Sequence, residues 1–209
     1  MTVSAAIELQ RAPLSTGMVL AAGGSRRLGR PKQLLPVWGR PLLEVVLARV
    51  CASQLDDVVV VLGESADEIS RTVDIGRARI TVNTEYATGM SSSLRAGVKA
   101  VDVDMCRLVV ILGDQPNISA TLIDDLLALH CESGLPAAAL SLGGLLHPPV
   151  VLDRSLWGEL LALSGDVGCR ALIRSRPELV AVLPVAQSSG QPVDIDTEAD
   201  YQELISAGD

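Results

Sequence analysis

The chain has 209 residues and carries 25 acidic residues against 17 basic ones, which gives a formal net charge of −8. An acidic chain with only 2% aromatic residues is poorly suited to nucleic acid, because it lacks both a basic surface for phosphates and rings for base stacking. The length fits one domain with a full hydrophobic core, and we expect a flexible leader at 1–15 and a single domain at 16–209.

The sequence also limits the compartment and the metal chemistry. No apolar run reaches the length of a membrane span, and the first 16 residues lack the pattern of a signal peptide. The four cysteines form no Cys-x-x-Cys pair, which is typical of reduced thiols. With two histidines in all, a histidine-rich metal site is excluded. We therefore expect a cytoplasmic protein without a membrane partner.

Apolar runs alternate with helix-patterned segments along the chain. The runs predict strands at 17–22, 58–62, 80–82, 108–112, 137–142, 149–152 and 179–185. The helical patterns lie at 41–54, 65–73, 91–101, 119–131, 156–163, 168–174 and 198–206. Because the strand segments are apolar on both faces, they predict an α/β fold of three layers, Rossmann-like, with a mostly parallel sheet covered by helices on both faces. Ligands of such sheets bind beyond the carboxyl ends of the strands.

The first expected strand runs into a loop of glycine, serine and cations. Between residues 9 and 43 there are six Lys and Arg residues and no acid, and Lys32 is one of two lysines in the chain. Glycines let backbone N–H groups converge on an anion, so this loop predicts a phosphate site. Neither Gly-x-x-x-x-Gly-Lys-Ser/Thr nor Gly-x-Gly-x-x-Gly is present here. The candidate binding residues are Leu20, Ala21, Ala22, Gly23, Gly24, Ser25, Arg26, Arg27 and Lys32.

Two later segments carry carboxylates that could bind a cation. Asp114 follows the strand at 108–112 and is either a Mg²⁺ ligand at a strand tip or an aspartate that caps a turn. Asp194 and Asp196 precede the last helix, where helix capping accounts for the acids at 198 and 200 but not for these two. The segment therefore offers a second carboxylate for a cation.

Three further segments have both a structural and a functional interpretation. Residues 83–94 form a polar loop entering a helix, where Asn83, Gly89, Ser91, Ser92 and Ser93 either cap the helix or hold ribose or phosphate. His147 is either structural or on the side of a second substrate. Residues 165–170, Gly-Asp-Val-Gly-Cys-Arg, are either a turn between helices or a substrate loop that contains Asp166.

These motifs together resemble the molybdenum cofactor guanylyl- and cytidylyltransferase family, over residues 17–206. Residues 20–32 match its Leu-Ala-(Ala/Gly)-Gly-x-Ser-x-Arg-(Leu/Met)-Gly-x-Pro/Asp-Lys signature without a gap, and 113–116 match its Asp-Gln-Pro strand end. Residues 83–94 are similar to a substrate-lining segment of the cytidylyltransferase branch, and 165–170 to Gly-Asp-x-Gly-x-Arg. The chain departs from the family at 146–149, with Leu146 and an extra proline, and at Ala199.

The resemblance implies a nucleotidyltransferase that uses Mg²⁺ to transfer CMP from CTP to the terminal phosphate of molybdopterin, releasing pyrophosphate. It implies catalytic roles for Arg27, Lys32 and Asp114, and a Mg²⁺ site on Asp114 and Asp196, with Asp194 as the alternate ligand. Gln115, His147 and Asp166 would lie on the acceptor side. A molybdoenzyme that receives the product is the partner it suggests.

Three alternatives remain open on sequence grounds. A related transferase could use another NTP or another phosphorylated acceptor. Some relatives are described as small oxidoreductases, although the absent dinucleotide fingerprint argues against that chemistry. A third alternative is a chaperone that carries the cofactor without catalysis.

Overall fold

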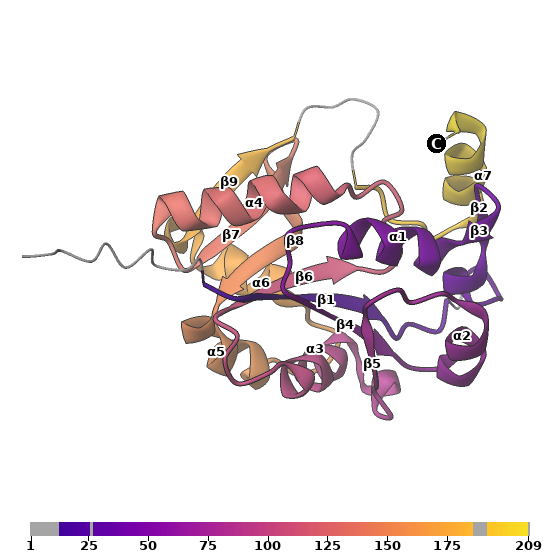
Figure 1. The fold of residues 1–209 in the computed structure, drawn as a ribbon, viewed down its shortest axis with the longest axis horizontal. Helices are drawn as coiled ribbons and strands as arrows, with labels where there is room; N and C mark the ends of the chain where they lie inside the picture. Colours follow the sequence, from indigo (N-terminus) through magenta and orange to yellow (C-terminus); the bar gives the residue numbers. More distant parts are fainter. Residues whose placement is uncertain (1–12, 26, 186–191, 209) are drawn as a thin grey trace, which may run out of the picture.

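The computed structural model describes residues 13–25, 27–185 and 192–208, and its core is a seven-stranded sheet (Figure 1). The strand order is β5-β4-β1-β6-β8-β7-β9. Only β8 runs antiparallel to its neighbours β6 and β7, so the predicted mostly parallel sheet is confirmed. The strands are β1 (Ser15–Ala21), β4 (Asp57–Leu62), β5 (Arg79–Val82), β6 (Arg107–Leu112), β7 (Ala137–Leu142), β8 (Leu145–Asp153) and β9 (Val180–Pro184).

Helices cover both faces of this sheet, as Figure 1 shows for α1 and α4 on one side and α3 and α5 on the other. The α-helices are α1 (Leu42–Cys51), α2 (Ala66–Thr72), α3 (Met90–Ala100), α4 (Ala120–Ser133), α5 (Trp157–Ala162), α6 (Cys169–Ser175) and α7 (Glu198–Ala207). Short 3₁₀ helices lie at Lys32–Leu34, Tyr86–Thr88, Arg154–Leu156 and Pro177–Leu179. The three-layer α/β architecture predicted from the alternating pattern is therefore confirmed.

Three strands differ from the sequence prediction. β8 begins at Leu145, four residues before the expected strand, because it pairs with β7 as a hairpin and passes its two prolines through a register shift. Ala139 pairs with Val150 and Leu140 pairs with His147, so residues 148–149 have no partner in the ladder, where proline lacks the N–H donor. A second two-stranded sheet, β2 (Pro36–Val37) with β3 (Arg40–Pro41), was not predicted, since two-residue strands give no periodic signal.

The central strands are buried on both faces, as their apolar sequences predict. All residues of β1, β4 and β6 are buried except Leu20, Asp57 and Leu112, which are partly buried. Two hydrophobic clusters result, one packed against α1, α2, α4 and α7 and the other against α3, α5 and α6. Burial of aliphatic side chains in these clusters holds the strand ends in a fixed register.

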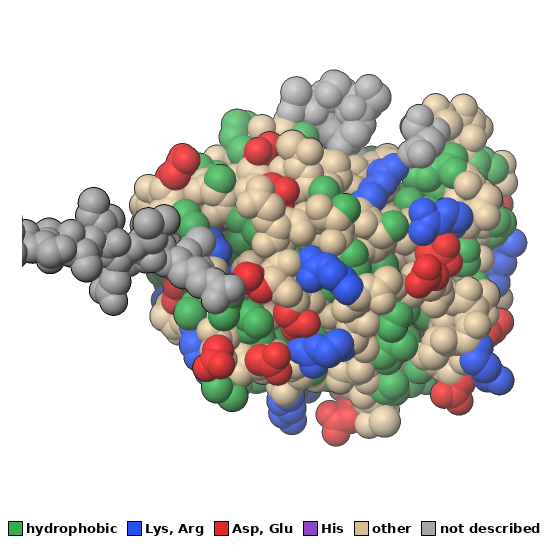
Figure 2. All heavy atoms as spheres, in the orientation of Figure 1, with side chains coloured by type: hydrophobic (Ala, Val, Ile, Leu, Met, Phe, Trp, Pro, Cys, Tyr) green, Lys and Arg blue, Asp and Glu red, His purple; other side chains and the backbone are tan. Residues whose placement is uncertain are grey.

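The surface of the protein is of mixed charge. On the face drawn in Figure 2, basic and acidic side chains are interspersed, and no continuous basic stripe crosses that face. None of the helices in the described part of the chain is long and apolar enough to cross a membrane. Most of the expected leader, residues 1–12, lies outside the described residues.

Candidate active site

The site forms where two neighbouring strands end. β1 and β6 pair in parallel, with Leu20 opposite Leu112, and the N–H of Gly113 continues the ladder to the carbonyl of Leu20 at 2.9 Å. From β1 the chain builds outward through β4 to β5 and then returns to β6 on the other side of β1. This reversal of strand order opens a crevice beyond the carboxyl ends. It brings the glycine-rich loop and Asp114 to one place.

The loop after β1 is held by side chains rather than by regular structure. Ser25 has a φ of +48°, and its hydroxyl accepts a hydrogen bond from the backbone N–H of Lys32 at 2.9 Å. The buried side-chain amide of Gln33 donates to the carbonyls of Ala21 and Gly23 at 2.8 and 3.0 Å. Gln33 is thus a site residue that the sequence analysis missed. Its only sequence signal is its position next to Lys32.

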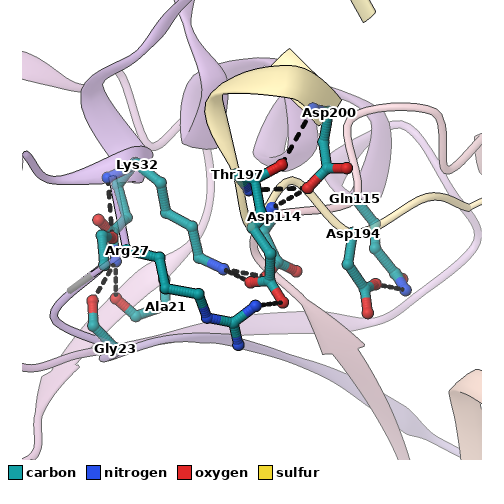
Figure 3. Close-up of polar contacts among 12 residues, drawn as sticks. Ala21, Gly23, Arg27, Lys32, Asp114, Gln115, Asp194, Thr197 and Asp200 are labelled. Atoms are coloured by element: carbon teal, nitrogen blue, oxygen red, sulfur yellow. Dashed lines mark hydrogen bonds and ion pairs between the residues drawn. The ribbon is translucent and has the colours of Figure 1, made fainter. Parts of the chain in front are cut away.

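Lys32 is the centre of the polar contacts drawn in Figure 3. Its ammonium donates to a carboxylate oxygen of Asp114 and, at 3.0 Å, to Oδ1 of Asp196. Arg27 reaches the other oxygen of Asp196 at 3.4 Å. The two carboxylates predicted to share a cation therefore face one another across a lysine.

Burial and charge act in opposite directions on this cluster. Burial raises the pKa of the Asp114 carboxyl, the acids at 194 and 196 act in the same direction, and Lys32 opposes them. For Lys32, burial disfavours the ammonium, but the carboxylates of Asp114 and Asp196 outweigh burial and raise its pKa. The site thus concentrates negative charge around one largely buried cation.

The segment before α7 places the second carboxylate. The backbone N–H of Ile195 donates to the carbonyl of Asp114 at 3.1 Å, which fixes this segment against the end of β6. A capping box between Thr197 and Asp200 begins α7, and the carboxylate of Asp200 also accepts the N–H of Asp196 at 3.1 Å. Capping therefore explains Asp200, as expected from the sequence, and leaves Asp196 free of that role.

The alternate ligand Asp194 has a different partner. Its carboxylate accepts a hydrogen bond from the side-chain amide of Gln115 at 2.7 Å (Figure 3). Gln115 is buried and Asp194 faces the cavity. Of the two candidates, Asp196 is the one whose carboxylate contacts the same lysine as Asp114.

These groups line one cavity of about 550 Å³, a volume within the range of small-ligand sites, ~300–1,000 Å³. Most of the residues predicted for the site line it: Leu20, Ala21, Ala22, Gly23, Arg27, Lys32, Gly89, Ser93, Asp114, Asp166, Asp194 and Asp196. Lining residues that the prediction left out are Gln33, Tyr86, Met90, Val110, Leu112, Gly113, Pro148, Gly168, Cys169 and Arg170. Some of these lie within the segments matched to the family, where they were given no role of their own: Tyr86, Met90, Gly113, Gly168, Cys169 and Arg170. The apolar strand residues Val110 and Leu112 carry no motif.

The predicted residues that do not line the cavity are Gly24, Ser25, Asn83, Ser91, Ser92, Gln115 and His147. Asn83 is buried, and its amide donates to the hydroxyls of Ser92 and Ser93 at 2.8 and 3.0 Å. These contacts fix the start of α3 rather than exposing the polar groups. Arg26, also predicted for the loop, lies outside the described residues.

The loop at residues 165–168 packs on the start of α3. A Cβ on Gly89, whose φ is +113°, would overlap the carbonyl group of Gly165. The N–H of Ser91 donates to that carbonyl at 3.2 Å, and the N–H of Met90 donates to Oδ1 of Asp166 at 3.3 Å. Asp166 therefore supports the N-terminus of a helix, where a negative charge is favourable.

The carboxylate pair fits a divalent cation. Oδ1 of Asp114 is buried and has no hydrogen-bond partner within the described chain, so it is an acceptor available to a cation. No group of three or more His, Cys, Asp or Glu side chains in the described chain is arranged to hold a metal. Mg²⁺ needs only one or two protein carboxylates when substrate phosphates and water complete its shell. Asp114 and Asp196 supply such a pair.

Comparison with known proteins agrees with this architecture. A family model described as a MobA-like NTP transferase domain matches residues 17–181. The chain belongs to the MobA-like NTP transferase family, a family of nucleotidyltransferases.

The similar proteins differ in their names. The nicotine blue oxidoreductase of Paenarthrobacter nicotinovorans is 36% identical over 87% of this chain and 93% of its own. The crystal structure of an Rv0371c homologue from Mycobacterium sp. strain JC1 superposes with a TM-score of 0.82 at 36% identity, covering 92% of this chain and 96% of that one. The Mycobacterium tuberculosis Rv0371c complex with manganese has a TM-score of 0.80 at 27% identity, covering 93% and 99% of the two chains.

Proposed function

We propose that the protein transfers CMP from CTP to the terminal phosphate of a molybdopterin-type cofactor and releases pyrophosphate. The observation that carries the proposal is the contact of Lys32 with both Asp114 and Asp196 at the mouth of the glycine-rich loop. A cation and two carboxylates beside a phosphate-binding loop are the groups that phosphoryl transfer needs. The choice of CTP and molybdopterin rests on the resemblance of residues 20–32 and 83–94 to the cytidylyltransferase branch.

The chemistry requires no protein nucleophile. A phosphate monoester is largely ionised at neutral pH, so its oxygen attacks the α-phosphorus of CTP directly. The bond from that phosphorus to the bridging oxygen breaks, and pyrophosphate leaves with the electron pair. Catalysis is then positioning and neutralisation of charge. The loop amides and the cations Arg27 and Lys32 hold the triphosphate in line with the acceptor.

A divalent metal belongs to this proposal. Asp114 and Asp196 would hold it, and it would neutralise charge on the phosphates. The manganese complex of the similar Rv0371c protein supports a divalent ion. The cavity lining, with four acids against three cations among its described residues, also favours a substrate that arrives with a metal. We propose Mg²⁺ as that ion.

The test is release of pyrophosphate with each of the four NTPs, with and without molybdopterin. We expect release with CTP that depends on molybdopterin and on Mg²⁺, and weaker release with GTP. The other lysine of the chain provides the control: Lys99→Ala should retain activity, and Lys32→Ala should lose most of it. Equal or better use of GTP contradicts the choice of nucleotide, and no release with any NTP contradicts the transfer itself.

A second candidate is oxidoreductase activity, favoured by the name of the 36% identical relative from Paenarthrobacter nicotinovorans. The chain lacks a Gly-x-Gly-x-x-Gly fingerprint after its first strand, which argues against a Rossmann-type dinucleotide site. Nicotine blue with NADH or NADPH, followed by absorbance, separates the two candidates. Turnover that is unaffected by Lys32→Ala would favour the oxidoreductase.

A further inference from the structure

The cations of the cavity are not equivalent. Lys32 contacts two carboxylates, and Arg27 contacts Asp196. Arg170 also lines the cavity, yet it makes no hydrogen bond and no ion pair with any residue that the structure describes. A guanidinium offers five N–H donors in a planar fork suited to phosphate or carboxylate. Its donors in this cavity remain available to a ligand.

Arg170 lies on the opposite side of Asp114 from the glycine-rich loop. The loop follows β1, Asp114 follows β6, and β8 is the next strand of the sheet. α6, which contains Arg170 in its first turn, packs against β8. The strand order therefore separates two cationic regions of one cavity, with the carboxylates between them.

The backbone that carries Arg170 is fixed. Gly89 closely approaches Gly165, and Asp166 accepts the N–H of Met90, so the loop leading into α6 is anchored on α3. Asp166, which the sequence analysis placed on the acceptor side, lines the cavity and uses Oδ1 in this anchoring contact. Arg170 is the side chain of residues 165–170 that offers unused donors to the cavity.

The neighbourhood of Arg170 is suited to an anion. Burial, followed by the charges of Arg170 and Arg174, lowers the pKa of His147, while Asp194 opposes them. The imidazole of His147 is therefore neutral at pH 7, and it places no second fixed charge beside Arg170. An incoming anion meets one guanidinium, that of Arg170, whose donors have no partner among the described residues.

We propose that Arg170 anchors the anionic group of the acceptor substrate, so that the acceptor is a phosphate ester rather than a neutral alcohol or sugar. This proposal rests on the proposed nucleotidyl transfer and identifies a residue that binds the acceptor in that reaction. In the reaction, one acceptor phosphate oxygen bonds to the α-phosphorus of CTP, and the bond to the pyrophosphate oxygen breaks. Arg170 acts as a binding residue that orients the attacking phosphate; it neither gains nor loses a proton.

Two substitutions on α6 test the assignment. Arg170→Gln removes the charge that faces the cavity. Arg174→Gln removes an arginine one turn later, which is exposed and does not line the cavity, and is the matched control. We expect Arg170→Gln to raise KM for molybdopterin about tenfold to a hundredfold, the usual effect of losing a charge-assisted contact. KM for CTP should stay within about twofold, and Arg174→Gln should resemble the wild type.

A second measurement does not depend on turnover. Inorganic phosphate is titrated calorimetrically into the wild type and both variants, and we expect Arg170→Gln to bind it about tenfold more weakly than Arg174→Gln does. Equal phosphate affinity in the two variants, or a rise in KM for CTP instead of molybdopterin, overturns the proposal. If the wild type releases no pyrophosphate but Arg170→Gln still loses phosphate binding, the nucleotidyl transfer fails and the anion subsite stands.

Discussion

The ammonium nitrogen of Lys32 lies 3.0 Å from Oδ1 of Asp196, although 164 positions separate the two residues. Because Lys32 also contacts Asp114, one cation joins the loop after β1, the end of β6 and the segment before α7. The lysine stands between the two carboxylates that fit a metal. Loss of the Lys32 charge should therefore affect both the stability of the fold and the binding of a metal at these carboxylates.

The close approach of α3 to the loop at 165–168 predicts the effect of a single methyl group. Gly89→Ala should lower the free energy of unfolding and reduce activity, because its Cβ would overlap the carbonyl of Gly165 and shift the loop. Gly134→Ala is the control, since Gly134 also has a positive φ, +63°, but nothing lies within 4 Å of its Cβ position. Denaturant unfolding and steady-state rates of both variants make the comparison. Equal loss of activity in both contradicts a specific role for the Gly89 contact.

Cys169 lines the cavity but should resist alkylation. Burial raises the pKa of its thiol to about 12, so almost none of it is the reactive thiolate at pH 8. Exposed Cys106 and Cys131 should react with iodoacetamide under the same conditions, and mass spectrometry of peptides reads out each site. Labelling of Cys169 in the folded protein at a rate like that of Cys106 would contradict its burial.

The same thiol gives a dependence of stability on pH. Its pKa in the folded protein is above the ordinary value of 9.0, so the unfolded chain loses the proton first. Its contribution to stability is therefore complete below pH 9.0 and declines as the pH rises towards about 12. Denaturant unfolding of the wild type and Cys169→Ala across this range should show a steeper decline for the wild type.

The order of strands and helices was readable from the sequence, because buried parallel strands leave continuous apolar runs such as residues 108–112. The start of β8 was not, because its pairing with β7 overrides two prolines that locally oppose a strand. At the site, the charged side chains Lys32 and Asp114 were predicted because they follow apolar strand segments and match the family motifs. Gln33 was not identified, and Arg170 was noted only as part of the 165–170 motif, since the roles of both depend on which atoms lie opposite them after folding.

The sequence analysis did not show how Lys32 is held. Six cations without an acid between residues 9 and 43 predicted a phosphate site, with no acid nearby in the sequence to pair with Lys32. In the structure, acids from distant segments surround Lys32 instead. Contacts across 82 and 164 positions leave no local pattern in the sequence.

Removing the charge of Asp114 should affect activity more than stability. Asp114→Asn should cut kcat at least a hundredfold if the carboxylate holds the metal, since an amide does not supply the negative charge. Its side chain is only 15% exposed, more buried than a strand-tip position suggests, yet the amide is nearly isosteric and carries no charge to desolvate. The melting temperature should therefore change by only a few degrees. A variant with near-normal kcat at saturating Mg²⁺ would remove Asp114 from the metal site.

Substitution of Lys32 should weaken both catalysis and the fold. Lys32→Ala should lower kcat/KM for CTP about tenfold to a hundredfold, and Lys32→Arg should restore only part of it, because a planar fork does not replace a compact ammonium. Without metal, Lys32→Ala should also lose about 1–3 kcal/mol of stability, because it leaves the largely buried Asp114 without its cation and facing Asp196.

Magnesium should reverse that loss. If the ion binds where the lysine charge was, Mg²⁺ will raise the melting temperature of Lys32→Ala more than that of the wild type, since the variant gains a cation that the wild type already has. Lys99→Ala, which removes the other lysine from the exposed surface of α3, should behave as the wild type in every measurement. Melting curves with and without Mg²⁺, beside kcat/KM for CTP, make the test. A Lys32→Ala protein that is as stable as the wild type without metal, and gains nothing from Mg²⁺, would contradict the shared cation site on which the proposed mechanism depends.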